Sequence, residues 1–378
     1  MRVLHIYSGN LFGGIETLLI TLARERHLCP QMEPHFALCF EGKLSDALRR
    51  IGISVHILGN VKFSQPWTVW KARRQLSKVL HHLLPDIVIN HETWTHCLAA
   101  PVIRYNGIPI IFWMHGWGVG NRWYEYLARK TSPTGILATS YYSSKSLSKI
   151  FPNGKTEVLY PPVSRLQFNE ESRASSRNNI RDSLAISQES TVILTAGRVT
   201  PYKGYSLLIK ALNRIKEIPN WVSLIVGTPQ TKDESKYFSQ IQKLVSKYGL
   251  QKQIKFLGYR NDVPLLMRAA DLFCQANVGA EPFGIVFIEA LYAGLPIVTT
   301  RLGGAIEIVT DGCGKLVEAN NVGALSTALL ELIADPEKRQ KLGGNGLARA
   351  KELCDPYQRL SQLHIFLEKV LAQNANFN

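Results

Sequence analysis

The stretch EPFGIVFIEA, residues 281–290, carries two carboxylates eight positions apart. The apolar run after Gly284 predicts a helix that begins near this glycine, so Glu281 lies on the preceding loop and Glu289 lies just over one turn into the helix. A helix start offers unpaired N–H groups and a partial positive charge, which favour an anion such as a phosphate. Carboxylates beside an anion site suit hydroxyl groups, which donate hydrogen bonds to them.

A molecule with phosphates in the middle and hydroxyl-rich rings at both ends is a nucleotide sugar. We therefore test the rest of the chain against a nucleotide-sugar site. The alternative is that the two glutamates occur at this spacing by chance and bind nothing.

Composition bounds the class of protein. The 378 residues suit two domains, and 46% apolar with 19% charged residues is typical of a soluble globular protein. No apolar run reaches the roughly 18 residues of a transmembrane helix, and residues 1–7 lack the features of a signal peptide. The six cysteines form no Cys-x-x-Cys pair, so we expect a reduced, cytoplasmic chain without a zinc site.

The net charge is +15, and residues 1–165 hold 19 Lys and Arg against 9 Asp and Glu, a balance of +10. A basic surface favours anionic partners, which here are nucleotide phosphates, nucleic acid or an anionic membrane. The sequence contains no nucleic-acid-binding motif, so we expect no nucleic-acid partner.

Short apolar runs alternate with amphipathic stretches along the whole chain, which predicts parallel sheets covered by helices. The first half carries predicted strands at 3–7, 36–40, 55–58, 87–90, 108–114, 135–139 and 157–160, with helices at 16–26, 44–51, 68–84 and 93–105. The second half carries strands at 191–196, 222–226, 255–257, 272–275, 297–299 and 315–317, and a helix at 356–371 ends the chain.

The domain boundaries follow from this alternation. Residues 1–168 form one Rossmann-like, doubly wound α/β domain and residues 186–355 a second, with the polar stretch 169–185 as linker and 356–378 as a final helix. Such domains bind ligands beyond the carboxyl ends of their strands.

Two loops at predicted strand ends suit phosphate. Gly13 and Gly14 begin a helix and permit close backbone approach to a phosphate or sugar, although an ordinary strand-to-helix turn explains them equally well. Arg198 and Lys203 follow the first strand of the second half and would clamp a diphosphate, neutralising the charge that grows on it as it departs. The alternative for Arg198 and Lys203 is surface solubility.

Three further features have weaker signals. His115 closes an apolar strand and is either catalytic or structural. Tyr259 and Arg260 follow another strand and could hold a nucleotide base, whereas Asp262 suits a helix N-cap. The pair Gly303-Gly304 again precedes a predicted helix at a strand end.

Taken together, these motifs resemble the retaining glycosyltransferases of family 4, which have the GT-B fold. The resemblance spans nearly the whole chain and rests on Gly13-Gly14-Ile15-Glu16, His115, VLYPPV (158–163), Gly197-Arg198 with Lys203-Gly204, Glu281 with Glu289, and Gly303-Gly304 with Glu307. It implies transfer of a hexose from a UDP- or GDP-sugar to a glycan or glycolipid, with no cofactor and no required metal. It also implies that the final helix packs on the first domain and that the two domains close on the donor.

The resemblance assigns roles residue by residue. Glu281 would hold donor-sugar hydroxyls and Glu289 the ribose, while Arg198 and Lys203 clamp the diphosphate. Backbone N–H groups of Phe283, Gly284 and Ile285 would contact the phosphates, and His115 would lie beside the reacting face of the sugar. The family often has Asp after this histidine, where this chain has Gly116.

The sequence gives fewer indications about the acceptor-binding residues. Residues 67–80 mix tryptophans with basic residues at helical spacing, which suits a helix lying on an anionic membrane at the inner face, or a packed helix with a solvated basic face. Trp94, Trp113, Trp117 and Trp123 form either an acceptor platform or core. Rival functions are a nucleotide-sugar epimerase of similar architecture and a non-catalytic nucleotide-sugar-binding protein.

Overall fold

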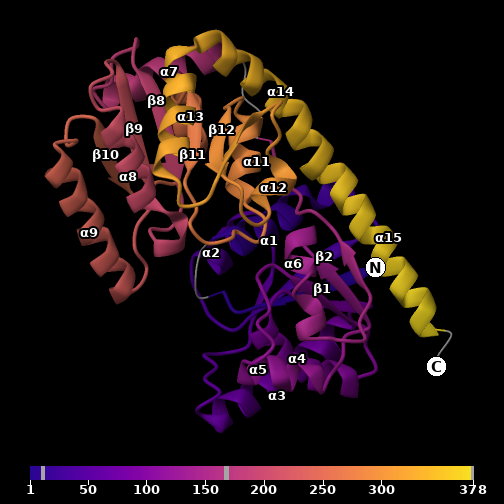
Figure 1. Cartoon of the computed structure of the whole chain (residues 1–378). Coiled ribbons are helices and arrows are strands. Elements are labelled where there is room, and N and C mark those ends of the chain that lie inside the picture. The colour runs from indigo at the N-terminus through magenta and orange to yellow at the C-terminus, as the bar shows by residue number, and fades with distance from the viewer. Residues whose placement is uncertain (10–12, 166–169, 376–378) are drawn as a thin grey trace. The chain divides into compact units, whose positions relative to one another are not determined.

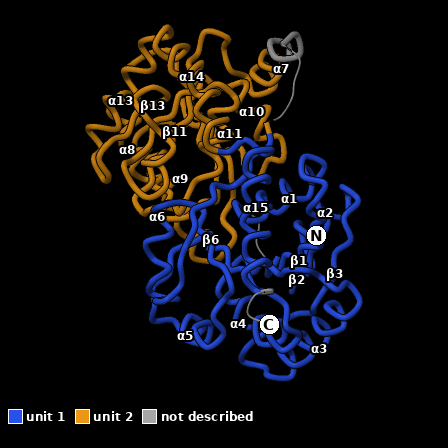
Figure 2. The backbone as a smooth tube through the Cα atoms, turned by 90° about the vertical axis from the view of Figure 1, so that its right-hand side faces the viewer, with its two compact units in different colours: residues 1–164, 354–378 blue, residues 165–353 orange. Residues whose placement is uncertain are grey.

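The computed structural model describes residues 1–9, 13–165 and 170–375 (Figure 1). The chain divides into two compact units, unit 1 with residues 1–164 and 354–378, and unit 2 with residues 165–353 (Figure 2). Within the described ranges, each unit is built on one sheet whose neighbouring strands all run parallel. The predicted fold class is therefore confirmed for both units.

Unit 1 has the strand order β3-β2-β1-β4-β5-β6-β7. Its strands are β1 (Arg2–Tyr7), β2 (Glu33–Leu38), β3 (Val55–Ile57), β4 (Ile87–Asn90), β5 (Ile110–Met114), β6 (Gly135–Ala138) and β7 (Thr156–Val158). Its helices are α1 (Gly14–Arg24), η1 (Glu25–Leu28), α2 (Lys43–Arg50), α3 (Pro66–Leu83), α4 (Thr93–Tyr105), α5 (Trp123–Arg129), α6 (Tyr141–Ser144), η2 (Leu147–Lys149) and α15 (Pro356–Ala375).

Unit 2 repeats the plan with the order β10-β9-β8-β11-β12-β13. Its strands are β8 (Thr191–Ala196), β9 (Trp221–Val226), β10 (Ile254–Gly258), β11 (Leu272–Gln275), β12 (Ile297–Thr300) and β13 (Gly314–Val317). Its helices are α7 (Glu170–Ser183), η3 (Pro201–Lys203), α8 (Tyr205–Arg214), α9 (Lys232–Tyr248), α10 (Val263–Ala269), α11 (Ile285–Tyr292), α12 (Ala305–Ile308), α13 (Val322–Ala334) and α14 (Pro336–Cys354).

The central strands are buried on both faces, which is why they read as unbroken apolar runs rather than as alternating patterns. Every residue of β5 and of β8 is buried, and Trp113 of β5 is fully enclosed. In both sheets the chain order reverses beside the first strand, between β1 and β4 in unit 1 and between β8 and β11 in unit 2. Loops that follow these strands therefore meet at the carboxyl edge of each sheet, where such folds bind ligands.

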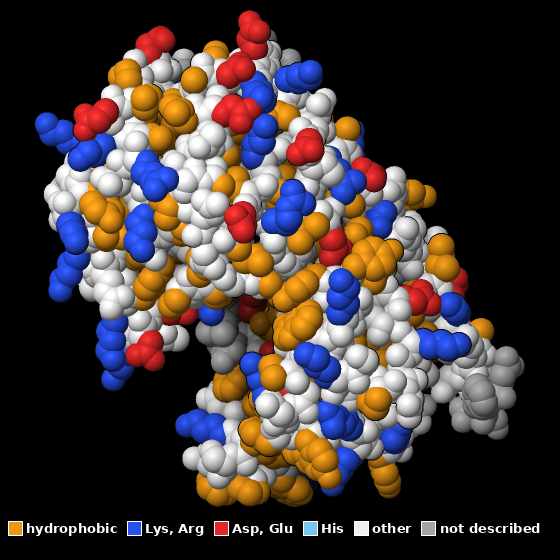
Figure 3. Space-filling model, in the orientation of Figure 1, with side chains coloured by type: hydrophobic (Ala, Val, Ile, Leu, Met, Phe, Trp, Pro, Cys, Tyr) orange, Lys and Arg blue, Asp and Glu red, His pale blue; other side chains and the backbone are white. Residues whose placement is uncertain are grey.

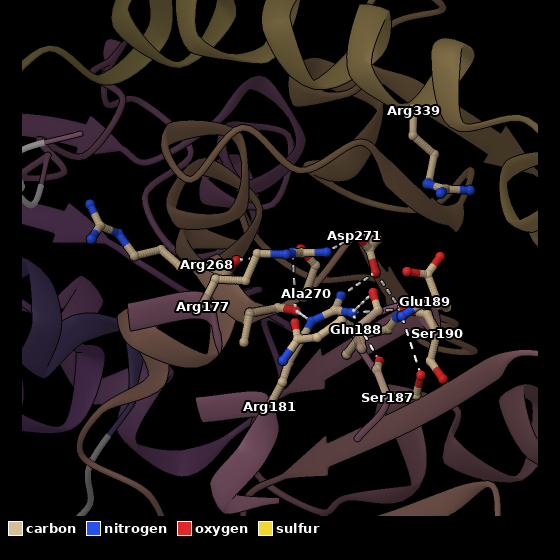
Figure 4. A network of polar contacts seen from close by, with 12 residues as sticks. Arg177, Arg181, Ser187, Gln188, Glu189, Ser190, Arg268, Ala270, Asp271 and Arg339 are labelled. Carbon is tan, nitrogen blue, oxygen red and sulfur yellow. Dashed lines mark hydrogen bonds and ion pairs between the residues drawn. The ribbon is translucent and has the colours of Figure 1, made fainter. Parts of the chain in front are cut away.

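The predicted linker at 169–185 is wrong for the residues that the structure describes, because helix α7 occupies Glu170–Ser183. Figure 4 shows how α7 is fixed to unit 2. Arg181 is fully buried and donates to the carbonyl oxygens of Ala269 at 3.0 Å and Ser190 at 2.9 Å. It also donates to one carboxylate oxygen of Asp271 at 2.7 Å, and Arg177 donates to the other at 2.6 Å. The arginines that made the stretch look solvent-exposed are thus the groups that anchor it.

The final helix packs on unit 1, as the fold class predicted. Lys369 of α15 forms an ion pair with Glu157 at 2.7 Å. A side chain at Gly135 of β6 would lie 2.9 Å from Phe366 and 3.1 Å from Val370, so α15 packs closely on the strand at this glycine. Within the described residues, no helix combines the length and the apolar character that crossing a membrane requires.

Candidate functional site

The loops after β8 and β11 meet in unit 2 and carry the most enclosed ion pair of the predicted site. Lys203 ends η3 and is buried, and its ammonium contacts the Glu281 carboxylate. The two loops are joined by the N–H groups of Val278 and Gly279, which donate to the carbonyl oxygen of Tyr202 at 2.9 and 3.1 Å. The structure therefore brings together two of the residues that the sequence singled out, 78 positions apart.

Gly204 permits this meeting. Its φ of +69° favours glycine, and a side chain on it would overlap the carbonyl of Ala276 in the facing loop. The side-chain amide of Gln275 lies at the end of β11, oriented so that its oxygen accepts from the Lys203 ammonium at 3.1 Å and from the Asn277 amide nitrogen at 3.2 Å. Both amides are fully buried, so they support Lys203 from the protein interior.

A third loop holds Glu281 in place. The N–H of Gly304 donates to the carbonyl oxygen of Glu281 at 2.8 Å, and a side chain on Gly304 would lie 2.6 Å from the Cα of Phe283. Gly303 has a φ of +60°, and a side chain there would lie 2.8 Å from the backbone nitrogen of Glu281. This glycine pair is explained by close packing of the Glu281 loop.

Helix α11 begins directly after this loop, as the sequence predicted, with Gly284 at its N-cap in the left-handed region. The first N–H groups of a helix have no acceptor within it, so this end of α11 is suited to an anion. Glu289 lies on the second turn, and burial raises the pKa of its carboxyl group to about 7. Among the described residues, its carboxylate has no hydrogen-bond or ion-pair partner.

Arg198 does not join the Lys203 pair. Its guanidinium lies 3.2 Å from Glu234 and retains 33% side-chain exposure. Glu234 also accepts from the N–H of Gln230 at 2.7 Å, ahead of α9, so it fixes both the arginine and the loop after β9. Glu234 gives no functional signal in the sequence, because its position resembles that of any acidic residue in a first helical turn.

The loop after β10 differs from the prediction. Arg260 binds both carboxylate oxygens of Asp262, at 2.8 and 2.6 Å. Asp262 occupies the N-cap position of α10, as predicted, but its side chain makes no capping hydrogen bond. The stronger contact to a guanidinium has replaced it. Tyr259 is exposed.

In unit 1, the first glycine loop is tied to its own helix. Glu16 of α1 is buried and accepts from the N–H of Gly13 at 2.7 Å and from the Tyr7 hydroxyl at 2.8 Å. Gly14 begins α1. Residues 10–12 of the same loop lie outside the described residues.

His115 follows β5 and belongs to a chain of three imidazoles. Its Nε2 lies 2.9 Å from Nδ1 of His91, and Nε2 of His91 lies 2.9 Å from Nδ1 of His5. Burial lowers the pKa of His5 and of His115 to about 3 and lowers that of His91 well below its ordinary value, so all three rings are neutral at pH 7. His5 and His91 were missed in the sequence, because they lie 86 positions apart and are brought together only by the order of the strands.

The described residues contain no group of three or more His, Cys, Asp and Glu that could hold a metal ion.

Families of known proteins match both parts of the chain. The model of the glycosyl transferases group 1 matches residues 176–349, and that of glycosyltransferase family 4 matches residues 12–165. A GDP-mannose-dependent alpha-(1-6)-phosphatidylinositol monomannoside mannosyltransferase of Mycolicibacterium smegmatis is 30% identical over 66% of this chain and 67% of its own. The chain is a member of the group 1 glycosyltransferases.

Other relatives of this glycosyltransferase agree with that assignment. The lipopolysaccharide core biosynthesis mannosyltransferase LpsB of Rhizobium meliloti is 25% identical over 76% of this chain and 75% of its own. The crystal structure of Anabaena HepE in complex with UDP-glucose superposes with a TM-score of 0.85 at 23% identity, covering 98% of this chain and all of HepE. The superposition confirms the GT-B fold of the glycosyltransferase.

The glycosyltransferase also exposes aromatic side chains on unit 1. Trp67 and Trp70 of α3 are 59% and 60% exposed, and Trp123 and Tyr126 of α5 are 52% and 59% exposed. We call these four residues the aromatic surface. Figure 3 shows hydrophobic side chains gathered among Lys and Arg at the lower end of unit 1, where Figure 1 labels α3 and α5.

The predicted basic face of α3 is only partly free. Arg73 donates to the carbonyl oxygens of Leu98 at 2.9 Å and Cys97 at 3.1 Å and so fixes α3 to α4, whereas Arg74 lies over the exposed ring of Trp70 at 5.5 Å. Of the four tryptophans expected to form either a platform or core, Trp113 is core and Trp94 packs on Phe40 and Phe63 at 6.4 and 5.2 Å.

Proposed function

We propose that this glycosyltransferase moves a hexose from a UDP- or GDP-sugar to a glycan or glycolipid acceptor of the cell envelope, with retention of the anomeric configuration. The observation that carries the proposal is the contact between Lys203 and Glu281 beside the start of α11. In a nucleotide sugar the anomeric carbon joins the hydroxyl-bearing ring to the phosphate. Groups that bind the two must therefore be neighbours, as this carboxylate and ammonium are.

Each group then has a distinct task in unit 2. Lys203 and Arg198 meet the negative charge that develops on the departing diphosphate, with help from the N-terminal dipole of α11. Glu281 accepts hydrogen bonds from sugar hydroxyls, and Glu289 accepts them from the ribose. Protein cations take the part that a metal ion takes in other transferases, so we propose a reaction without a required metal or cofactor.

The names of the relatives support the proposed classes of donor and acceptor. HepE binds UDP-glucose, and the M. smegmatis and R. meliloti relatives are mannosyltransferases of a phosphatidylinositol mannoside and of lipopolysaccharide. We propose that unit 2 of this chain holds the donor and that unit 1 holds the acceptor beside His115.

The test is a panel of UDP-, GDP- and ADP-sugars, scored by thermal stabilisation and by donor turnover with and without acceptor glycans. The proposal requires that one donor stabilises the protein and is turned over in the presence of EDTA. NMR of the product should show the same anomeric configuration, α or β, as in the donor. Donor epimerisation without an acceptor would instead identify an epimerase, and tight binding without turnover would identify a non-catalytic binding protein.

We further propose that the enzyme is cytoplasmic and lies peripherally on the inner face of the membrane through its aromatic surface. Exposed tryptophans among basic residues suit the headgroup region of an anionic bilayer, where each Lys or Arg near the surface contributes about 1 kcal/mol. Flotation with anionic and neutral vesicles tests this proposal. A Trp70→Ser, Arg74→Gln variant should float less than the wild type, and Arg73 is left intact because it fixes α3 to α4.

A further inference from the structure

The chain of three histidines spans three neighbouring strands of unit 1. His5 lies within β1, His91 follows β4 and His115 follows β5, and these strands are adjacent in the sheet. Both links join a Nδ1 to a Nε2 at 2.9 Å, and neighbouring rings lie within 22° of parallel. His5 and His91 are buried, whereas His115 is partly accessible at the carboxyl edge of the sheet.

A neutral imidazole carries one hydrogen, so it donates from one nitrogen and accepts at the other. If His5 donates from Nδ1, His91 accepts at Nε2 and must donate from its own Nδ1, and His115 then carries its hydrogen on Nδ1 as well. If His115 donates from Nε2, the same reasoning places every hydrogen on Nε2. The geometry allows only these two arrangements, and all three rings share one tautomer in each.

The other ring nitrogen of His115, Nδ1, has no hydrogen-bond partner among the described residues. A substrate can therefore supply its partner. In the first arrangement this nitrogen is a hydrogen-bond donor, and in the second it is an acceptor. Its character is therefore decided together with the hydrogen positions on two rings inside the sheet.

We propose that His91 and His5 are positioning residues that fix the tautomer of His115, and thereby the hydrogen bond that His115 offers to the sugar. This inference rests on the proposed function, because that function places His115 beside the acceptor sugar. A fixed tautomer presents one donor or one acceptor without reorganisation when the substrate arrives, which is the condition for effective hydrogen-bond catalysis.

The tautomers can be read by long-range ¹H–¹⁵N correlation NMR of the protein labelled with ¹⁵N-histidine at pH 7.5, with signals assigned from single His→Gln variants. We expect His5, His91 and His115 all to carry hydrogen on the same nitrogen. His96 is an internal reference, since its Nε2 lies 2.7 Å from the carbonyl oxygen of Thr131 and must donate to it. Different tautomers among the three rings would overturn the inference.

The variant His91→Phe removes both hydrogen bonds of the chain. We expect the His115 signals to average between tautomers, and kcat to fall at least about tenfold because a histidine in the wrong tautomer loses much of its catalysis, with the KM for donor little changed. The His96 signal and the thermal midpoint report whether the variant is folded. His91→Gln, whose amide offers a donor and an acceptor, should recover part of kcat.

Unchanged kcat in a folded His91→Phe enzyme would overturn the positioning role. If His91→Phe does not fold, the wild-type tautomers and the His91→Gln rate decide the question. If the wild type transfers no sugar from any donor, the proposed function fails. The NMR result still stands on its own: one shared tautomer shows that the three histidines are coupled, and different tautomers show that they are not.

Discussion

Replacing Lys203 by Met separates the structural from the chemical role of the central ion pair. The side chains of Lys203 and Glu281 are only 9% and 15% exposed, so the single variant leaves an uncompensated, largely buried carboxylate. Loss of one partner of such a pair costs about 3–5 kcal/mol of stability. For a unit of this size, each kcal/mol lowers the thermal midpoint by about 2–4 °C, so we expect a fall of roughly 6–20 °C.

The chemical loss is separate from this loss of stability. If Lys203 stabilises the departing diphosphate, its removal costs about 2.7–4 kcal/mol of transition-state stabilisation, or about 10²–10³ in kcat. The double variant Lys203→Met, Glu281→Gln removes the unpaired charge and should recover most of the thermal midpoint. It should not recover kcat, because no cation has been restored.

The assay is steady-state transfer with the preferred donor, alongside thermal unfolding of each variant. Lys210→Met is the matched control, since Lys210 is exposed on α8 and should change neither quantity. A separate chemical role for Lys203 is excluded if Lys203→Met retains kcat, or if the double variant recovers rate and stability together.

Three further predictions concern unit 2. Glu289→Gln should be more stable than the wild type by up to about 3 kcal/mol at pH 8 and equally stable at pH 4. The wild-type carboxyl has a pKa raised to about 7, so the wild type loses stability as the pH rises from about 4.5 through 7. Urea unfolding at several pH values measures the difference, and a free energy of unfolding that changes equally with pH in both proteins would contradict it. Arg181→Met should lower stability by about 3 kcal/mol or more in the same assay, whereas equal midpoints would show that the α7 anchor contributes nothing. Gly304→Ala should displace the Glu281 loop and reduce kcat at least about tenfold in a folded protein, while Gly344→Ala, where a side chain meets nothing within 4 Å, should retain it.

The strands were predictable because burial on both faces makes their sequences mostly apolar. The predicted strand at 191–196 coincides with β8, and that at 272–275 coincides with β11. The linker failed for the opposite reason. Arg181 is buried within a network of carbonyl oxygens and Asp271, and composition cannot distinguish such an arginine from a solvated one.

The residues of the candidate site were predictable one by one, but most of their contacts were not. Arg198 and Lys203 were expected to act as one clamp, whereas Arg198 contacts Glu234 and Lys203 contacts Glu281. The pair Gly303-Gly304 was recognised only as a second glycine pair before a helix, and its packing against the Glu281 loop depends on the order of strands in space.

Strand order is the step that connects these cases. Once a doubly wound sheet is recognised, its first and fourth strands can be placed side by side, and the loops that follow them must meet. In unit 2 this rule joins Lys203 to Glu281. In unit 1 it joins the end of β1 to His91, and the next strand adds His115. The rule would have directed attention to His91 from sequence, but the nitrogen-to-nitrogen contacts require side-chain orientations that strand order alone does not determine.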